Sequence, residues 1–279
     1  MNFIESYKLK IENIDNYIHQ YLKKYHTAAP VITDAMSYSV LNGGKRLRSI
    51  LCTEICRMLG GSFEDSIPFA AAIELIHAYS LVHDDLPAMD NADTRRGQPS
   101  CHKKFGEDIG ILCGDALLNS AYELILSNVD TKNKLTAGLC IADAAGALGM
   151  VNGQVLDLES GSVKNADEKI ITDIVLQKTM ALIKASVLSG AYIAGCNTKE
   201  LEDMSEFSYH LGLAFQIRDD FEDMHEDEST QSDCPNFITA LGEEVAAERL
   251  KMHSEMSMKI LSDYDKNGFL VSLHKYLFK

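Results

Sequence analysis

The chain has 279 residues, of which 46% are hydrophobic and 24% are charged, a composition typical of a globular protein. Its formal net charge of −15 argues against nucleic acid as a partner and against an anionic membrane surface, because both are bound through an excess of Lys and Arg. An anionic substrate is still compatible with this charge if metal ions bridge it to the protein.

Apolar residues recur at helical spacing along most of the chain, whereas the alternation that marks strands is nearly absent. One segment, AAIELIHAYSLVH, is apolar on almost every side, which is typical of a central helix in a bundle. No linker divides the chain, so we expect one domain over residues 1–279. The predicted fold class is all-α, a single bundle of about ten helices. Helices are expected over 2–26, 31–42, 45–59, 66–86, 107–128, 132–158, 168–195, 199–226 and 237–263, with a short one near the C-terminus.

The cysteines and the most apolar stretches both indicate a soluble protein. Seven cysteines lie without zinc-type spacing, and we expect them to be reduced thiols in a cytoplasmic protein. The N-terminus has no signal-peptide pattern. The stretches 137–151 and 180–196 are interrupted by Asp143 and Lys184, so neither reaches the roughly 20 apolar residues that span a bilayer. We therefore expect no stable membrane insertion.

A first group of carboxylates stands in LVHDDLPAMDNADTRRG, where Asp84 and Asp85 end an apolar helix and Asp90 follows. Two adjacent Asp at the end of an apolar run are costly unless something pairs them. On a regular helix Asp84 and Asp90 would point far apart, but Pro87 breaks the hydrogen-bond ladder. We infer that the chain bulges here and returns Asp90 toward Asp84.

A second group stands in LAFQIRDDFEDM and contains Asp219, Asp220 and Asp223. Asp219 and Asp223 are four residues apart and therefore share one helix face. Carboxylates without His or Cys suit Mg²⁺, which completes its shell with water and substrate phosphate. Two such groups facing each other would hold a diphosphate between them. The alternative is that each group is a solvated acidic face or a helix cap.

Cations are concentrated in a few places of this acidic chain, which favours a role in binding anions. GGKRLR places three of them after Gly43 and Gly44, where the backbone can approach a ligand and a helix start adds its positive dipole end. The candidates are Lys45, Arg46, Arg48, Arg95 and Arg96.

Two further residues are candidates with an open alternative. His77 lies two turns before Asp84 and either faces the same cavity or is a satisfied core histidine. Lys178, followed by Thr179, stands inside an apolar helix and either binds substrate or extends to solvent.

Taken in order, these motifs resemble those of the bacterial farnesyl diphosphate synthases, a group within the trans-polyprenyl synthase family. The resemblance covers almost the whole chain and rests on GGKRLR, HDDLPAMD, the Arg95-Arg96 pair, GMVNGQVLDLE, QKTMALI and LAFQIRDDFED. It implies helices around a deep central cavity, a homodimer, and about three Mg²⁺ per active site. It also implies that isopentenyl diphosphate is joined to dimethylallyl or geranyl diphosphate, giving farnesyl diphosphate by ionisation, condensation and proton loss.

The resemblance further implies a role for each matching residue. Those of the catalytic centre are Asp84, Asp85, Asp90, Asp219, Arg95 and Lys178. Metal ligands are Asp84, Asp85, Asp90 and Asp219, with Asp220 and Asp223 beside them. The allylic substrate is held by Arg95, Lys178, Thr179 and Gln216. Isopentenyl diphosphate is held by Lys45, Arg48, His77 and Arg96. The site is supported by Gln154 and Asp157, and chain length is set by Tyr79 with Ser80.

One departure from the family pattern concerns the segment after the second carboxylate group. The family usually carries two lysines there, whereas this chain has Cys234-Pro235-Asn236-Phe237 and no Lys between Lys199 and Lys251. We therefore expect one contact to the leaving group to be missing. Three alternatives stay open: a geranyl or geranylgeranyl diphosphate synthase, a weakly active regulatory subunit of such an enzyme, and a terpene cyclase or other metal-binding helical protein.

Overall fold

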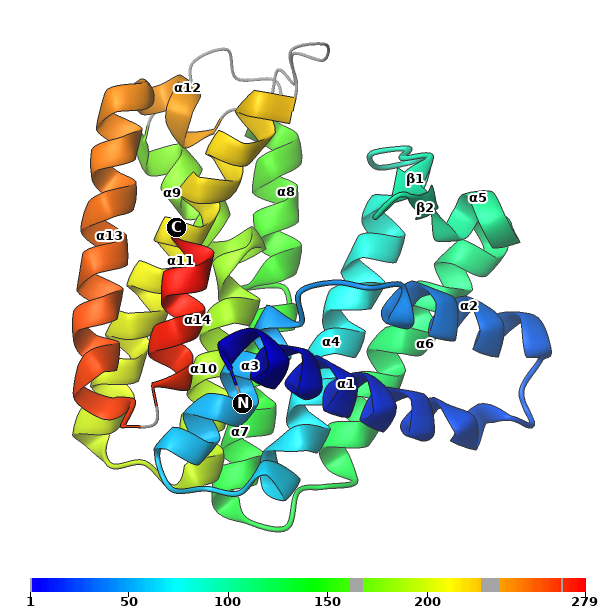
Figure 1. The fold of residues 1–279 in the computed structure, drawn as a ribbon. Coiled ribbons are helices and arrows are strands. Elements are labelled where there is room, and N and C mark those ends of the chain that lie inside the picture. Colours follow the sequence, from blue (N-terminus) through cyan, green and yellow to red (C-terminus); the bar gives the residue numbers. More distant parts are fainter. Residues whose placement is uncertain (1, 161–167, 227–235, 267) are drawn as a thin grey trace.

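The computed structural model describes residues 2–160, 168–226, 236–266 and 268–279, and helices dominate it (Figure 1). The segment 227–235, which contains Cys234, lies outside the described residues. The helices are α1 (Phe3–Leu22), α2 (Pro30–Leu41), α3 (Leu47–Met58), α4 (Phe63–Asp84), α5 (Cys101–Phe105), α6 (Glu107–Leu126), α7 (Lys132–Ala145), α8 (Met150–Ser160), α9 (Glu168–Lys178), α10 (Met180–Ala194), α11 (Thr198–Glu226), α12 (Phe237–Leu241), α13 (Glu243–Tyr264) and α14 (Phe269–Leu277). A 3₁₀ turn follows α1 at Lys23–Tyr25, and two short strands, β1 (Thr94–Arg95) and β2 (Gln98–Pro99), pair antiparallel.

The predicted all-α class is confirmed, and α4 and α10 are its central helices. α4 packs against α3 and α6, while α10 packs against α3, α7 and α11. Gly190 allows this closeness, because a Cβ there would lie 2.4 Å from the Cys52 carbonyl oxygen on α3. The helices α8, α9 and α11 stand on one side of the molecule and α4 with the hairpin on the other (Figure 1).

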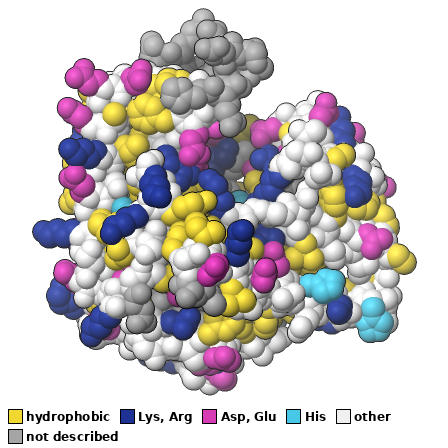
Figure 2. Space-filling view, viewed as in Figure 1, with side chains coloured by type: hydrophobic (Ala, Val, Ile, Leu, Met, Phe, Trp, Pro, Cys, Tyr) yellow, Lys and Arg dark blue, Asp and Glu magenta, His cyan; other side chains and the backbone are white. Residues whose placement is uncertain are grey.

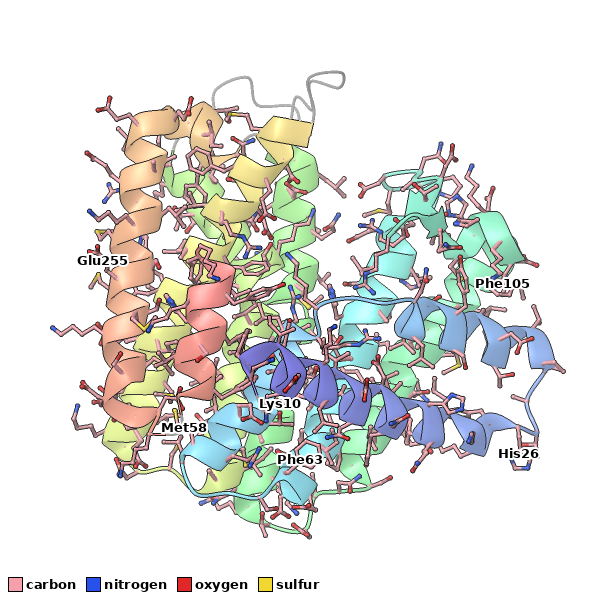
Figure 3. The ribbon with its side chains drawn as sticks, viewed as in Figure 1. Lys10, His26, Met58, Phe63, Phe105 and Glu255 are labelled. Carbon is pink, nitrogen blue, oxygen red and sulfur yellow. The ribbon has the colours of Figure 1, made fainter. Side chains whose placement is uncertain are left out.

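The N-terminal helix lies across both groups of helices. α1 is capped by Asn2, whose side chain accepts from the Glu5 amide while Glu5 bonds back to the Asn2 amide. Lys10 on α1 forms a 2.7 Å ion pair with Glu54 on α3 (Figure 3). This contact ties α1 to the helix that follows the GGKRLR loop.

Long predicted helices are divided in the structure at three places, one of which is Gly242, where the predicted helix 237–263 becomes α12 and α13. The predicted helix 132–158 is broken at 146–149, where the Gly149 amide donates to the Gly146 carbonyl. The predicted helix 168–195 is broken at Thr179, between α9 and α10. The hairpin was not predicted, because two-residue strands are too short to alternate. Its turn residues, Arg96 and Gly97, both have positive φ, as the tightest hairpin turns require.

Two apolar stretches differ from the expectation about membranes. α6, and the stretch 132–159 that includes α7, are long and apolar enough to cross a bilayer by length and composition alone. Core helices of soluble proteins pass the same test, and α6 packs along α4 and α2. Only 44% of the α6 window and 33% of the other window are buried, and the exposed residues include the apolar Ile111 and Leu112 on α6 and Leu135 and Leu139 on α7.

Candidate active site

Two adjoining cavities lie between the helix groups, where the surface is hollowed and Lys and Arg side chains gather (Figure 2). The first, here called the polar cavity, has a volume of about 870 Å³, and most of its lining residues are polar or charged, among them Lys45, Arg96 and Asp219. The second, of about 700 Å³, is mostly apolar and runs beside α4. Arg48, His77 and Thr179 line both, so the two cavities adjoin at these three residues.

The first carboxylate group stands at the mouth of the apolar cavity. α4 ends at Asp84, and the chain then turns back so that the Asp90 amide donates to the Asp84 carbonyl at 2.9 Å. The predicted return of Asp90 toward Asp84 is confirmed. Asp84 lines the apolar cavity, and burial raises the pKa of its carboxyl, with Lys178 opposing the shift and Asp90 adding to it. A carboxylate that loses hydration next to other carboxylates favours a cation between them.

The Asp85 side chain, unlike that of Asp84, is directed to a partner within the protein. It is 2% exposed, and Arg95 donates to it from Nη2 at 2.6 Å and from Nε at 3.1 Å. Asp85 lines neither of the two large cavities. In this arrangement Asp85 fixes the hairpin arginine, and this pairing raises the pKa of Arg95. Its predicted help in binding metal stays a prediction.

In the second carboxylate group, too, one of the two adjacent aspartates lines a cavity and the other is buried against the protein. Asp219 on α11 lines the polar cavity and accepts from Arg218 Nη2 at 2.6 Å, and burial raises its pKa. Asp220 is 5% exposed and accepts from the Gln216 amide and from the Phe237 backbone, each at 2.9 Å. Burial raises the pKa of Asp220 to about 6. Asp220 therefore anchors the chain at 237, and Asp223 is exposed.

These residues fit Mg²⁺ better than a softer metal. Among the described residues, no three His, Cys, Asp or Glu side chains gather into a metal-binding group. The described residues therefore do not form the closed four-ligand site that is typical of structural zinc. Mg²⁺ needs only one or two carboxylates and takes its other ligands from water and phosphate. Asp84 and Asp219 present carboxylates of this kind.

Two neighbouring arginines of GGKRLR have opposite surroundings. Arg46, in a left-handed conformation, is buried and pairs with Asp15 at 2.7 Å and Glu74 at 3.4 Å. Arg48 is half-buried and lines both cavities, and among the described residues it has no ion pair or hydrogen bond, its buried Nε included. Burial lowers the pKa of Arg48, while Glu74 and Asp219 oppose the shift. Arg46 therefore supports the fold, and Arg48 is placed to receive an anion.

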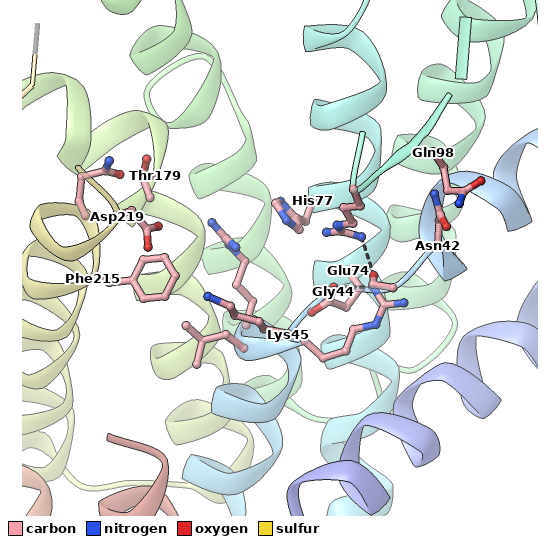
Figure 4. A pocket seen from close by; sticks show the side chains of 15 residues that line it. Asn42, Gly44, Lys45, Glu74, His77, Gln98, Thr179, Phe215 and Asp219 are labelled. Carbon is pink, nitrogen blue, oxygen red and sulfur yellow. Dashed lines mark hydrogen bonds and ion pairs between the residues drawn. The ribbon is translucent and has the colours of Figure 1, made fainter. Parts of the chain in front are cut away.

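Gly44 accommodates a third arginine. Its φ is +119°, and a Cβ there would lie 3.0 Å from the Arg96 guanidinium carbon. Arg96 Nη1 donates to the Gly43 carbonyl at 2.5 Å, so the hairpin closes on the glycine loop. His77 lines the same cavity as Lys45 (Figure 4), and burial, with Arg48 and Arg96, holds the pKa of His77 well below the usual range. His77 is therefore a neutral imidazole.

Lys178 is the last residue of α9 and Thr179 is the break before α10, and Gly153 on α8 lets α8 and α9 approach each other here. A Cβ at Gly153 would lie 2.2 Å from the Lys178 amide nitrogen, so no larger residue fits. Lys178 lines the apolar cavity and donates to Asp157 on α8 at 2.5 Å. Gln154 lines the same cavity. The break thus delivers a Lys to the mouth of the cavity opposite Asp84.

The predicted chain-length residues line the apolar cavity. Tyr79 and Ser80 both do so, and the Ser80 hydroxyl donates to the His77 carbonyl. Tyr79 is 9% exposed, and burial raises its pKa to about 12, so it stays neutral.

A model of the family described as polyprenyl synthetase matches residues 29–233. The chain belongs to the polyprenyl synthetase family. The family predicted from the sequence is confirmed.

The chain is similar to several proteins whose names are those of prenyl-transferring enzymes. It is 46% identical to the dimethylallyltranstransferase of Fischerella ambigua (strain UTEX 1903) over 195 residues, which are 68% of this chain and 56% of that protein. The chain thus spans little more than half of that relative. It is 37% identical to the farnesyl diphosphate synthase of Geobacillus stearothermophilus over 271 residues, 91% of this chain and 90% of that one. The apo structure of an FPP/GFPP synthase from Zymomonas mobilis has a TM-score of 0.89 and 30% identity, covering 98% of this chain and 99% of that one.

In this member of the polyprenyl synthetase family, the sequence did not predict four contacts, of which three are made by Arg218. Arg218 binds Asp219, stacks on Phe215 and donates to the Leu277 carbonyl of α14 at 2.9 Å. The Asn152 amide donates to the Gln177 side chain at 2.6 Å and joins α8 to α9. Arg218 stands within the motif LAFQIRDDFED, directly before its two adjacent aspartates, and this position is a signal that could have singled it out. The link between α8 and α9 depends on tertiary contacts.

The contrast between Arg46 and Arg48 gives a stability test. Arg46→Met should destabilise the protein by about 3–5 kcal/mol, because it removes the cation paired with the buried Glu74 and leaves that carboxylate only its hydrogen bonds from Ser49. Arg48→Met should leave the melting temperature unchanged or raise it, because it removes a desolvated charge that lacks a pair. Thermal unfolding of both variants without substrate measures this difference. Equal destabilisation of the two would contradict the assignment of Arg48 as an anion ligand.

Proposed function

We propose that the chain, as a single domain of residues 1–279, is a prenyl diphosphate synthase that makes farnesyl diphosphate from isopentenyl diphosphate and dimethylallyl or geranyl diphosphate. The observation that carries this proposal is the meeting of a cationic cavity and an apolar cavity at Arg48, His77 and Thr179. A prenyl diphosphate has the same division into an anionic head and an apolar chain. The activities of the similar enzymes from Fischerella and Geobacillus support this proposal.

Mg²⁺, about three ions per site, is the proposed cofactor. Asp84 and Asp90 would hold it at the mouth of the apolar cavity, and Asp219 would hold it from α11. When bound, it supplies positive charge that neutralises the diphosphate and makes it a better leaving group. Asp85 and Asp220 accept hydrogen bonds from the protein itself, so their proposed part is to fix Arg95 and the chain at 237.

The residues of the chain position two substrates. Arg95 and Lys178 would bind the allylic diphosphate, with Thr179 and Gln216 beside them. Lys45, Arg48 and Arg96 would bind isopentenyl diphosphate in the polar cavity, where the neutral His77 can donate a hydrogen bond.

The reaction breaks the bond between the allylic C1 and the diphosphate oxygen, and the electron pair leaves with the diphosphate. The double bond of isopentenyl diphosphate attacks C1, a carbon–carbon bond forms, and the departing diphosphate takes the proton that is lost. The protein stabilises charge and supplies no nucleophile.

A homodimer and a cytoplasmic location complete the proposal. Ile111, Val151, Val155 and Leu158 line the apolar cavity yet are 46–55% exposed, so a second copy of the chain would close its outer wall. The six cysteines in the described part of the chain are free thiols, which supports a reducing compartment.

Products of other lengths are the second candidate. The apolar cavity is about 700 Å³ and partly open, and the similar protein from Zymomonas mobilis is an FPP/GFPP synthase, whose name includes more than one product. A weakly active regulatory subunit is less well supported, because both carboxylate groups are present.

The metal assignment predicts that Asp84→Ala or Asp219→Ala lowers turnover by several orders of magnitude. Folding should be preserved, because each change removes a desolvated charge whose pKa burial has raised. Steady-state assays with Mg²⁺ and thermal unfolding measure the two effects. Near-normal activity in both variants would falsify the assignment.

The position of Tyr79 in the wall of the apolar cavity leads to a prediction about the length of the product. Tyr79→Ala should open space along the apolar cavity and shift products from fifteen carbons to twenty or more. Chromatography of the dephosphorylated products under excess isopentenyl diphosphate measures the shift. Identical fifteen-carbon profiles would show that Tyr79 does not limit the chain.

The dimer is tested by placing a charge on the exposed face of α6. Leu112 is 54% exposed and lines neither large cavity. Leu112→Glu should convert the native dimer to a monomer in sedimentation velocity, whereas Leu9→Glu on α1 should not. A native chain that sediments as a monomer at micromolar concentration contradicts the dimer.

A further inference from the structure

His83 is a polar side chain in the wall of the apolar cavity, one residue before Asp84. Its Nε2 lies 3.1 Å from the Ile111 carbonyl oxygen on α6, so the ring carries its proton on Nε2 and donates it there. The ring also meets Tyr79 edge to face, with centroids 5.9 Å apart and planes at 83°. The imidazole is thus held between α4 and α6, one helical turn from Tyr79.

Gly114 on α6 provides the space for this ring. A Cβ at Gly114 would lie 2.0 Å from His83 Nε2, 2.3 Å from Cδ2 and 2.7 Å from Cε1, whereas ordinary contacts begin at 3.4 Å. The imidazole therefore rests on the bare backbone of α6. A glycine inside a helix is up to about 1 kcal/mol less favourable than alanine. Gly114 therefore lowers the helix stability of α6 at the position where the His83 ring packs.

We propose that Gly114 and His83 form a second control on product length, separate from Tyr79 and resting on the proposed function. With glycine at 114 the ring stays against α6, and the cavity is wide between Asp84 and Tyr79. Any side chain at 114 displaces the ring. Because α6 blocks one direction and the α4 backbone is packed in the core, the ring moves into the cavity.

Gly114→Ala tests the proposal through the choice of primer. The narrowed cavity should still admit the five-carbon dimethylallyl group but exclude longer chains. We expect kcat/KM for geranyl diphosphate to fall about tenfold relative to dimethylallyl diphosphate, the scale of discrimination by small changes in an apolar pocket. The main product should shift from fifteen carbons to ten.

Two further variants distinguish the change in product length from a general loss of stability. In His83→Ala/Gly114→Ala the methyl group meets no imidazole, so products of fifteen carbons or more should return. Gly138→Ala on α7 is the matched control, because its Cβ would lie 2.6 Å from Ile125 Cγ2 on α6, and neither residue lines a large cavity. It should cost stability and leave product length unchanged.

The inference is overturned if Gly114→Ala keeps the native product, if the double variant stays shortened, or if Gly138→Ala gives the same shift. Absence of any product from the native chain with either primer would overturn the proposed function itself. A crystal structure of Gly114→Ala gives a readout that needs no turnover. The imidazole should lie in the cavity, and an imidazole still seated on α6, with the helices moved apart, overturns the inference.

Discussion

Uncompensated charge in the cleft is the constraint on which the site depends. Arg48 is half-buried with no ion pair among the described residues, and Asp84 is a carboxylate whose pKa burial raises. Such groups destabilise a fold, so their neighbours must be fixed by other interactions. Arg46 supplies one of these, since it joins Asp15 and Glu74, the latter in the wall of the polar cavity. Of the two neighbouring arginines, the protein thus pairs Arg46, which supports the fold, and leaves Arg48 without an ion pair among the described residues.

Close packing of the backbone at two glycines positions the cations Lys178 and Arg96 at the cleft. Gly153 lets α8 approach the break at Thr179, and the break delivers Lys178 to the cavity mouth. Gly44 lets the hairpin arginine Arg96 lie on the loop that precedes α3. In both places the lack of a side chain on glycine makes room for the segment that carries a cation. The arrangement explains how a chain with a net charge of −15 forms a cationic chamber.

The sequence allowed prediction of the all-α class, the family, and the return of Asp90 to Asp84, because helical periodicity and the Pro87 break are local signals. It did not separate Asp84 from Asp85, or Asp219 from Asp220. Adjacent residues on a helix point about 100° apart, and which of them faces a cavity depends on packing against distant elements. The pairing of Asp85 with the hairpin, and of Asp220 with the amide at 237, emerges only once those elements are placed. The hairpin itself is too short to leave a periodic signal.

The central claim is that this cleft binds diphosphate through carboxylates and cations together, so binding must require a divalent metal. Isothermal titration of inorganic pyrophosphate into the protein, with Mg²⁺ and then with EDTA, tests it most directly. The account predicts a measurable heat with Mg²⁺ that is lost in EDTA and in Asp84→Asn. Equal affinity in both buffers would show that the cations bind diphosphate alone, and would contradict the account.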